Sequence, residues 1–192
     1  PITRGSGARE CRASFGPKGE RIAYITDETR EEAIATADAW GRGEVRTVKP
    51  AGENGWHFPP AWSPEGKWIA FADMTHTLYI VPVEGGTPRK VDYCESSEIS
   101  EYVWSPDGRW LAYAMNNSNY FSSIFIHDVE KKESHQVTSW DTNDRTPAWD
   151  PDGRYLYFLS DRTTDPVIGW FDLETIVTQP SRPYLITLRA DV

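Results

Sequence analysis

A short turn motif recurs four times along the chain, and this repeat limits the fold more than any other feature of the sequence. Each copy places an aromatic residue first, a proline two positions later and a glycine two positions after that. The copies are Phe15–Gly19, Trp62–Gly66, Trp104–Gly108 and Trp149–Gly153. Their leading aromatic residues lie 47, 42 and 45 positions apart, and spacing in this range is typical of proteins built from stacked repeats.

The residues that follow each motif are repeated as well. An aliphatic residue stands seven positions after the leading aromatic residue, and a second aromatic residue stands nine positions after it. These pairs are Ile22 and Tyr24, Ile69 and Phe71, Leu111 and Tyr113, and Leu156 and Phe158. Because proline presets φ and glycine lets the chain reverse, each motif predicts a tight turn before a β-strand. The three leading tryptophans are expected to lie in the core.

The predicted strands are apolar on both faces. In the segment 67–72, Trp68 and Ala70 point to one face, while Ile69 and Phe71 point to the other. A sheet with one face in water would alternate polar and apolar residues, so this strand is expected to be covered on both sides.

Two further strands are expected in each repeat. Segments 78–81 and 123–126 predict a third strand, and segments 89–91 and 135–138 predict a fourth. Each repeat is therefore predicted to be a four-stranded antiparallel meander with two buried faces. Such meanders stack radially in β-propellers, so the predicted fold class is an all-β propeller, partial or open, with about four blades.

The repeat divides the chain into five parts. Residues 1–10 are expected to be the tail of a preceding blade, because Ile2 and Thr3 precede Phe15 at a spacing similar to that of Val137 and Trp149. The predicted blades are 11–49, 50–92, 93–138 and 139–192, the last with an irregular outer half and an exit strand. The chain is therefore expected to be a piece of a longer protein.

The first and last repeats depart from the pattern. Arg21 replaces the tryptophan of the later units, and the Ala-rich segment Glu31–Trp40 is compatible with a short helix. The register of the repeat instead favours a strand there. In the fourth repeat the register is lost after Asp161, so the segment 163–178 is not expected to form a normal strand pair. A final apolar strand is predicted at 184–188.

Charge and composition exclude several classes of protein. The 192 residues include 29 acidic and 20 basic side chains, a net charge of −9, whereas nucleic-acid binding needs concentrated positive charge. No apolar run approaches the roughly 20 residues that cross a bilayer, so no membrane span is predicted. Cys11 and Cys94 occupy non-equivalent positions of the repeat and are expected to be free thiols.

Three stretches resemble the propeller repeats of tricorn-like serine proteases. They are Ile99–Gly108, Thr146–Arg162 and Arg182–Arg189. The block Trp104–Tyr113 is also similar to the WD40-like repeat of the Tol-system periplasmic propeller protein, but the match to the tricorn-like group is closer. The resemblance covers most of the chain and implies an N-terminal β-propeller portion of such a protease. Its last stretch resembles the segment that leads toward the next domain.

The resemblance implies a role in proteolysis. Tricorn-like proteins are large serine peptidases whose propellers are thought to gate or channel substrate, while the catalytic serine and histidine lie in later domains. No residue of this chain matches that catalytic motif, so the resemblance implies a non-catalytic portion that serves substrate access and domain assembly. The alternative is a protein-binding propeller module of the Tol-system type. A third class, a propeller glycosidase or lactonase, would need a catalytic cluster that the sequence does not display.

The same reasoning suggests partners and a location. A peptide or protein partner and the remaining domains of the parent protein are expected, with no nucleic acid. An incomplete ring exposes two strand edges, so we expect an open arc or closure by another chain in a homodimer. The resemblance favours the cytoplasm, and the periplasm is the alternative.

Four residues are candidates for contact with a peptide or partner. Trp56 and His57 lie in the segment that leads into the second predicted blade, where such segments face the channel end of a propeller. Trp40 and Trp140 lie in connecting segments outside the repeated frame. Accessible tryptophans often dominate binding energy. The alternative is that these side chains pack onto the blade edges.

No catalytic residue, metal site or cofactor is predicted. Ser63 and Ser105 precede proline in turns, and the chain has no G-x-S-x-G elbow. The block that begins at Ser105 resembles a sialidase Asp-box only superficially and predicts a hairpin turn. The histidines form no ligand motif with each other or with cysteine. The aspartates of segment 141–152 lack the spacing of a calcium loop and are expected to form a solvated acidic loop.

Overall fold

The computed structural model describes residues 7–28, 30–48, 57–163, 166–168 and 175–188, and every regular element in them is a β-strand. No helix in these ranges is long and apolar enough to cross a membrane. Blades 1 to 3 contain, in chain order, β1 (Glu10–Phe15), β2 (Arg21–Thr26), β3 (Ala33–Asp38), β4 (Arg46–Val48), β5 (Ala61–Trp62), β6 (Trp68–Ala72), β7 (Thr77–Pro82), β8 (Arg89–Tyr93), β9 (Tyr102–Trp104), β10 (Trp110–Asn116), β11 (Ser122–Asp128) and β12 (Glu133–Gln136). Blade 4 contains β13 (Asp144–Trp149), β14 (Tyr155–Ser160) and β17 (Arg182–Thr187), and a separate hairpin contains β15 (Pro166–Ile168) and β16 (Thr175–Val177).

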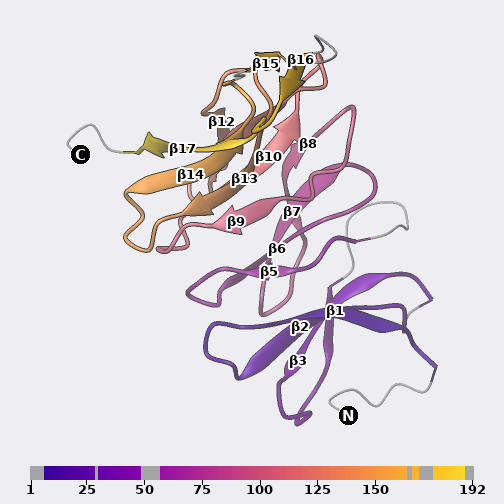
Figure 1. Ribbon diagram of the computed structural model, residues 1–192. Coiled ribbons are helices and arrows are strands. Elements are labelled where there is room, and N and C mark those ends of the chain that lie inside the picture. Colours follow the sequence, from indigo (N-terminus) through magenta and orange to yellow (C-terminus); the bar gives the residue numbers. More distant parts are fainter. Residues whose placement is uncertain (1–6, 29, 49–56, 164–165, 169–174, 189–192) are drawn as a thin grey trace.

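The blades follow one another along an arc, with blade 1 at one end and blade 4 at the other (Figure 1). The first strands of the blades, β1, β5, β9 and β13, lie against one another from each blade to the next. Three of the four blades are antiparallel four-stranded meanders. The all-β propeller architecture of about four blades is therefore confirmed, and closure by a second chain stays a prediction.

The Pro-Gly motifs form the turns between the first and second strands. The glycines of the second, third and fourth motifs have φ values of +73°, +70° and +68°, a region that disfavours side chains with a Cβ atom. In the second, third and fourth motifs, the side chain of the residue before the proline closes the turn. Ser105 Oγ accepts the Trp110 N–H at 2.9 Å, and Asp150 Oδ1 accepts the Tyr155 N–H at 2.6 Å. The predicted hairpin turn at Ser105 is confirmed.

The Ala-rich segment of blade 1 forms a strand, so the helical alternative for Glu31–Trp40 is wrong. β3 pairs with β2 along its whole length, from Arg21 opposite Asp38 to Thr26 opposite Ala33. Its residues from Ala33 to Ala37 are buried. Burial on both faces of the blade outweighs the weak intrinsic preference of alanine for helix.

Blade 4 differs from the others in its third position. β14 pairs with β17 and not with the segment directly after it. β15 and β16 pair only with each other, in agreement with the irregular outer half that the sequence predicted. The predicted final strand is therefore the third strand of this blade. It is held there because Tyr184, Ile186 and Leu188 pack against the apolar cluster between blades 3 and 4.

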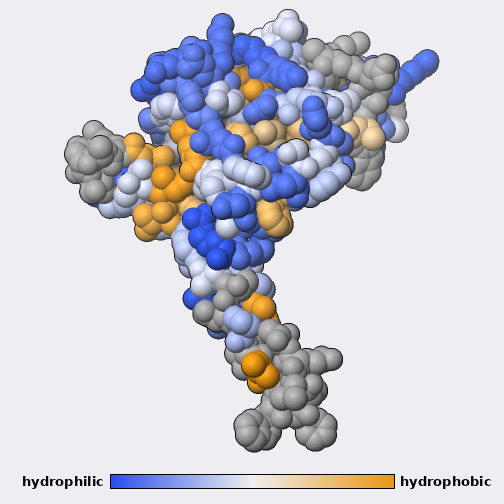
Figure 2. Space-filling model, turned by 90° about the horizontal axis from the view of Figure 1, so that it is seen from above, coloured by the Kyte–Doolittle hydropathy of each residue, from blue (hydrophilic) through white to orange (hydrophobic). Residues whose placement is uncertain are grey.

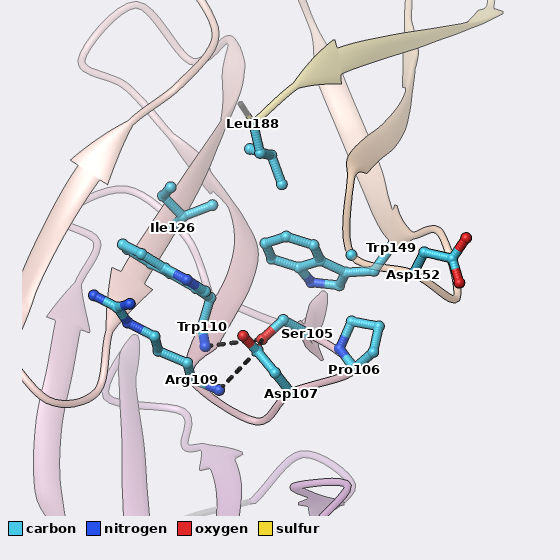
Figure 3. A pocket seen from close by; sticks show the side chains of 10 residues that line it. Ser105, Pro106, Asp107, Arg109, Trp110, Ile126, Trp149, Asp152 and Leu188 are labelled. Carbon is cyan, nitrogen blue, oxygen red and sulfur yellow. Dashed lines mark hydrogen bonds between the residues drawn. The ribbon is translucent and has the colours of Figure 1, made fainter. Parts of the chain in front are cut away.

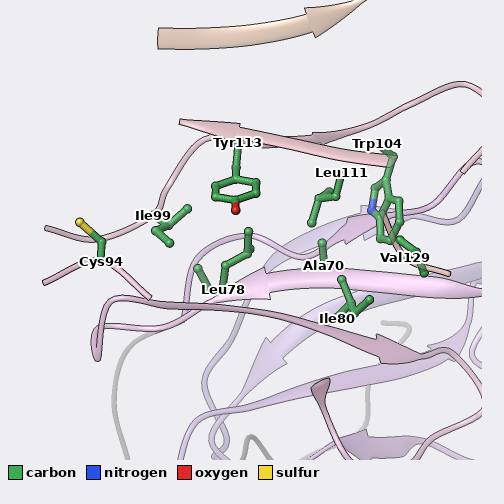
Figure 4. Packing of buried hydrophobic residues seen from close by; sticks show 10 residues of the cluster. Ala70, Leu78, Ile80, Cys94, Ile99, Trp104, Leu111, Tyr113 and Val129 are labelled. Carbon is green, nitrogen blue, oxygen red and sulfur yellow. The ribbon is translucent and has the colours of Figure 1, made fainter. Parts of the chain in front are cut away.

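An apolar cluster lies between each pair of consecutive blades. Figure 4 shows Leu111 and Tyr113 of blade 3 facing Ala70, Leu78 and Ile80 of blade 2. All five side chains are buried. The residues seven and nine positions after a leading aromatic residue thus face the preceding blade. The residue eight positions after it faces the next blade. The prediction that the second strands are covered on both sides is confirmed for β2, β6 and β10, but it is wrong for β14, where Tyr157 is exposed.

The leading tryptophans join each blade to the preceding one through a repeated hydrogen bond. The indole Nε1–H donates to a backbone carbonyl in the first strand of the preceding blade. The acceptor is the residue just before the leading aromatic residue of that blade. The three bonds are Trp62 to Ser14 O (3.2 Å), Trp104 to Ala61 O (3.0 Å) and Trp149 to Val103 O (3.2 Å). Trp104 is buried, whereas Trp62 and Trp149 are half-buried and pack against the apolar clusters, so the prediction that all three lie in the core is confirmed fully only for Trp104. Those two rings line open clefts between blades.

Both cysteines are free, as the sequence predicted. Cys11 is half-buried in β1, whereas Cys94 is buried in the cluster between blades 2 and 3. The Cys94 Sγ lies 3.5 Å from Ser96 Oγ and the same distance from the Asn116 carbonyl oxygen. The two thiols therefore have separate structural surroundings.

Candidate functional site

The blades have two ends with different loops. The Pro-Gly motifs lie at one end, which we call the turn end, and the hairpins between second and third strands lie at the other, which we call the hairpin end. At the hairpin end, His76 and Tyr120 have φ values of +64° and +66°. Their N–H groups donate to Asp73 O at 3.2 Å and Asn117 O at 2.9 Å. These bonds hold a backbone conformation that non-glycine residues seldom adopt.

The structure separates the tryptophans that the sequence singled out. Trp40 follows β3 near Asp38, which pairs with Arg21 beside a Pro-Gly turn, so Trp40 lies at the turn end. Trp140 lies at the hairpin end, where its carbonyl accepts the Asn119 Nδ2–H at 2.6 Å. Their side chains are 74% and 64% exposed, so the alternative that they pack onto the blade edges is wrong for both. Trp56 lies outside the described residues.

His57 lies at the hairpin end but is only 3% exposed. Its N–H donates to Glu32 Oε2 at 3.1 Å, and its carbonyl accepts Arg12 Nη1 at 2.9 Å. Burial lowers the pKa of His57, although Glu32 and Asp73 act in the opposite direction. These contacts join blades 1 and 2, and the ring is not presented to the surface.

Two further exposed aromatic residues lie in the hairpin loop that is hydrogen-bonded to the segment of Trp140. We define the aromatic patch as Tyr120, Phe121 and Trp140, all of which are exposed. The bond from Asn119 to Trp140 joins the hairpin of blade 3 to the segment that leads into blade 4. The sequence pattern missed Tyr120 and Phe121, because they lie in a hairpin tip without a repeated position. Their aromatic character in a predicted loop was the one signal that pointed to them.

Hydrogen bonds hold the loop that carries this patch. Asn117 Nδ2 donates to Phe121 O at 2.9 Å and to Ser123 Oγ at 2.7 Å. The Phe121 N–H donates to Asn119 Oδ1 at 3.1 Å. The Ser122 N–H donates to Asn143 Oδ1 at 3.2 Å, which ties the hairpin to blade 4. A loop fixed in this way loses less conformational entropy when a partner binds.

The acidic segment 141–152 is not a solvated loop throughout. Asp144 is fully buried and pairs with Arg162 Nη2 at 2.8 Å, and Asp150 is buried in its turn. The prediction is therefore wrong for these two residues, because each carboxylate replaces water with protein hydrogen bonds. Asp141 is exposed, and a hydrogen bond from Ser139 lowers its pKa. Within the described ranges, no group of three or more His, Cys, Asp or Glu residues is placed to hold a metal ion.

A cleft of about 720 Å³ opens between blades 3 and 4 at the turn end (Figure 3). Its apolar walls are formed by Trp110, Ile126, Trp149 and Leu188. The corresponding cleft between blades 1 and 2 is smaller, about 270 Å³. There the counterpart of Trp110 is Arg21, whose Nη1 reaches Glu84 Oε1 at 3.1 Å across the joint. The two clefts therefore differ both in volume and in the chemistry of this position.

The two ends of the arc expose residues that neighbouring blades cover elsewhere. Phe15 is 67% exposed, although it occupies the position of the leading tryptophans. Tyr157 is exposed in blade 4 at a position where blades 1 to 3 have a buried alanine. Seen from above, the surface is mainly hydrophilic, with apolar residues in separate areas (Figure 2). The exposed apolar positions are therefore local features of the surface.

Sequence comparison places these repeats among those of known proteins. The family described as "Tricorn protease second beta propeller domain" matches residues 1–192. Tricorn protease homolog 1 of Streptomyces coelicolor is 31% identical over 180 residues, which cover 92% of this chain and 17% of the homolog. The tricorn protease of Thermoplasma volcanium is 27% identical over 175 residues, which cover 88% of this chain and 17% of that protein. The chain thus spans 17% of the length of each relative.

Solved structures show the same fold. A crystal structure of the tricorn protease matches with a TM-score of 0.77 and 21% identity, over 88% of this chain and 17% of that one. A putative TolB from Agrobacterium tumefaciens matches with a TM-score of 0.59 and 22% identity, over 82% of this chain and 56% of that one. Together with the four repeated blades, the match over the whole chain shows that it belongs to the family of tricorn protease second β-propeller domains.

Proposed function

We propose that this chain is a non-catalytic propeller portion of a tricorn-like serine peptidase and acts in substrate access and domain assembly. The observation that carries the access role is the aromatic patch, Tyr120, Phe121 and Trp140, at the hairpin end. Serine peptidase activity is proposed for the parent protein and not for this portion. Ser63 and Ser105 support that division, because both are buried and accept hydrogen bonds in turns.

The aromatic patch suits an extended peptide with apolar side chains. Covering one exposed aromatic side chain contributes about 1.5–3 kcal/mol, and the hydrogen-bonded hairpin presents these rings in a fixed arrangement. The carbonyl of Trp140 and the amide of Asn119 already bond to each other, so the rings and not the loop backbone supply the contact. The expected ligand is a peptide that is recognised by apolar character more than by sequence.

A binding experiment tests the access role. Fluorescence or calorimetric titration with a capped Phe- and Leu-rich peptide should show saturable binding that Trp140→Ala weakens roughly 30-fold, as expected for loss of about 2 kcal/mol. Trp40→Ala is the matched control, because Trp40 is at least as exposed but lies at the turn end. Unchanged affinity of the Trp140→Ala protein would contradict the proposal. Binding of a folded protein but of no peptide would instead favour a Tol-type binding module.

The assembly role rests on the exposed faces of blades 1 and 4. Phe15 and Tyr157 occupy positions that a neighbouring blade covers elsewhere in the arc, so further parts of the parent protein are the expected partners. Tyr157→Asp should therefore prevent capture of the separately produced remainder of the parent protein, whereas Tyr120→Asp should not. Equal capture by wild type and Tyr157→Asp would argue against assembly through this face.

A further inference from the structure

The cleft at the turn end recurs between blades at the same positions of the repeat. Arg21 and Trp62 line the smaller cleft between blades 1 and 2. Their counterparts Trp110 and Trp149 line the larger cleft between blades 3 and 4. Blades 1 and 2 each have all four strands in place, and the smaller cleft is nevertheless present. The repeat itself therefore forms a cleft at this position.

At the other two joints, a guanidinium group of the chain itself lies at this position. Between blades 2 and 3, the Arg89 guanidinium lies 4.2 Å from the centre of the Trp68 ring. Trp68 is the counterpart of Trp110, because each stands six positions after a leading tryptophan. The Nε and Nη2 atoms of Arg89 are buried and have no hydrogen-bond partner among the described residues, so the ring is the contact that receives this cation. Between blades 1 and 2, Arg21 itself occupies the position and reaches Glu84 Oε1 at 3.1 Å.

Blade 3 does not supply the corresponding arginine. His135 pairs with Ile126 as Arg89 pairs with Ile80, so His135 takes the place of Arg89 in the repeat. The His135 side chain is 55% exposed, and its Nε2 lies 3.9 Å from Glu133 Oε2 of its own strand. The cleft between blades 3 and 4 thus keeps the tryptophan ring but lacks the stacked fourth-strand arginine of blade 2.

The walls of this cleft suit a planar cation. Figure 3 shows Trp110 and Trp149 on opposite sides of the cleft, with Arg109 on the side of Trp110 away from Trp149. Arg109 is held there because its Nη2 lies 3.1 Å from Oδ2 of the buried Asp128, which also neutralises its charge. A cation gains most from a tryptophan ring where water is excluded, and a volume of about 720 Å³ lies within the range of known ligand sites.

Asp107 provides a hydrogen-bond acceptor in the same cleft. Its Oδ1 accepts the Ser105 hydroxyl at 2.6 Å and the Arg109 backbone N–H at 3.1 Å, and these bonds fix the carboxylate. Its Oδ2 has no hydrogen-bond donor among the described residues. A guanidinium group carries several N–H donors in one plane, and a carboxylate is among its strongest partners. The free oxygen and the ring together match the two ways in which arginine is recognised.

We propose that the cleft between blades 3 and 4 binds the side chain of an arginine in a partner polypeptide. The guanidinium group stacks on Trp110, as Arg89 does on Trp68, and donates to Asp107 Oδ2, while its aliphatic stem lies along Ile126. The net charge of −9 favours the approach of a basic segment. The cleft lies at the turn end and the aromatic patch at the hairpin end, so either proposal can fail without the other.

A capped tripeptide tests the proposal. The probe is acetyl-Gly-Arg-Gly-amide, titrated into the ¹⁵N-labelled chain, and the indole N–H signals of Trp110 and Trp149 should shift saturably in NMR spectra. Citrulline has nearly the shape of arginine but no charge, so the citrulline peptide should bind at least about tenfold more weakly. Equal affinity for the two peptides, or no saturable shift with the arginine peptide, would overturn the proposal. Shifts of Trp140 in place of these two signals would also overturn it, because they would put the peptide at the aromatic patch.

Two variants separate the site from the fold. His135→Arg copies the arrangement of Arg89 and fills the cleft with a guanidinium group of the chain itself, so the probe should bind at least about tenfold more weakly. His135→Gln is the matched control and should bind normally.

Trp110→Leu removes the ring and should also weaken binding about tenfold. The fold should survive this change, because the same position carries Arg21 in blade 1 and Tyr155 in blade 4. An unchanged thermal midpoint of unfolding checks that the variant is folded. Wild-type affinity in both His135→Arg and Trp110→Leu would show that the peptide binds elsewhere and would overturn the proposal.

Discussion

Replacement of Trp104 measures how strongly a leading tryptophan holds two blades together. Its ring is buried between blades 2 and 3, and its Nε1–H donates to Ala61 O at 3.0 Å. Trp104→Phe keeps most of the apolar contact but removes the donor to the carbonyl of half-buried Ala61, which should cost about 1–2 kcal/mol. Trp104→Ala also removes the ring and leaves a cavity, so its cost should be about 3–5 kcal/mol.

The assay is urea denaturation followed by far-UV circular dichroism, with the slope m compared among variants. Phe15→Ala is the matched control, since Phe15 occupies the same position of the repeat but is mostly exposed. Without a preceding blade to cover it, its loss should change the free energy of unfolding by no more than about 0.5 kcal/mol. The contrast between the two positions isolates the contact with the preceding blade.

Two results would refute this reasoning. If Trp104→Phe and Trp104→Ala destabilise equally, the hydrogen bond and not the buried ring holds the joint. If Phe15→Ala costs as much as Trp104→Ala, then the residue acts within its own blade, and the leading aromatic position has no special role between blades. A Trp149→Phe variant repeats the hydrogen-bond test at the half-buried joint between blades 3 and 4.

Two further predictions concern buried charge. Burial and the nearby Arg89 lower the pKa of His127, so its neutral form is favoured in the folded chain. This stabilisation is present above the unfolded pKa of about 6.5 and is lost as pH falls below that value. The urea concentration at the midpoint of unfolding should therefore drop between pH 7.5 and 5.5, and His127→Gln should reduce that drop. A pH response that is identical in wild type and variant would contradict this. Asp144→Asn should cost about 3 kcal/mol because it leaves Arg162 without its buried partner, whereas exposed Asp152→Asn should leave the thermal midpoint unchanged. Equal midpoints for both aspartate variants would show that the buried pair contributes little.

Much of the fold was predictable because each blade is encoded locally. The motif at Trp104–Gly108 specifies a turn through proline and glycine, and Ser105 closes it with a hydrogen bond to a residue only five positions away. The apolar residues after it alternate between the preceding and following blades with the period of a strand. Four copies of such a local pattern define both the strands and the faces that must be buried.

The candidate site was less predictable. Trp140 was identified from its position outside the repeat, but Tyr120 and Phe121 were not. Their loop is joined to the Trp140 segment by a bond between Asn119 and Trp140, which are 21 positions apart. The burial of His57 likewise depends on Glu32 and Arg12, which belong to the preceding blade. No local pattern specifies such contacts, because they form between loops of different blades.

The turns, the antiparallel meanders of blades 1 to 3 and the two buried faces of their second strands could be predicted from the amino-acid sequence, since all of these follow from backbone preferences and spacing over a few residues. Two outcomes emerged only in the folded chain: β17 takes the third position of blade 4, and Asp144 is buried against Arg162. These outcomes depend on the free energy of contacts between residues far apart in the chain. Such contacts exist only once the blades have stacked.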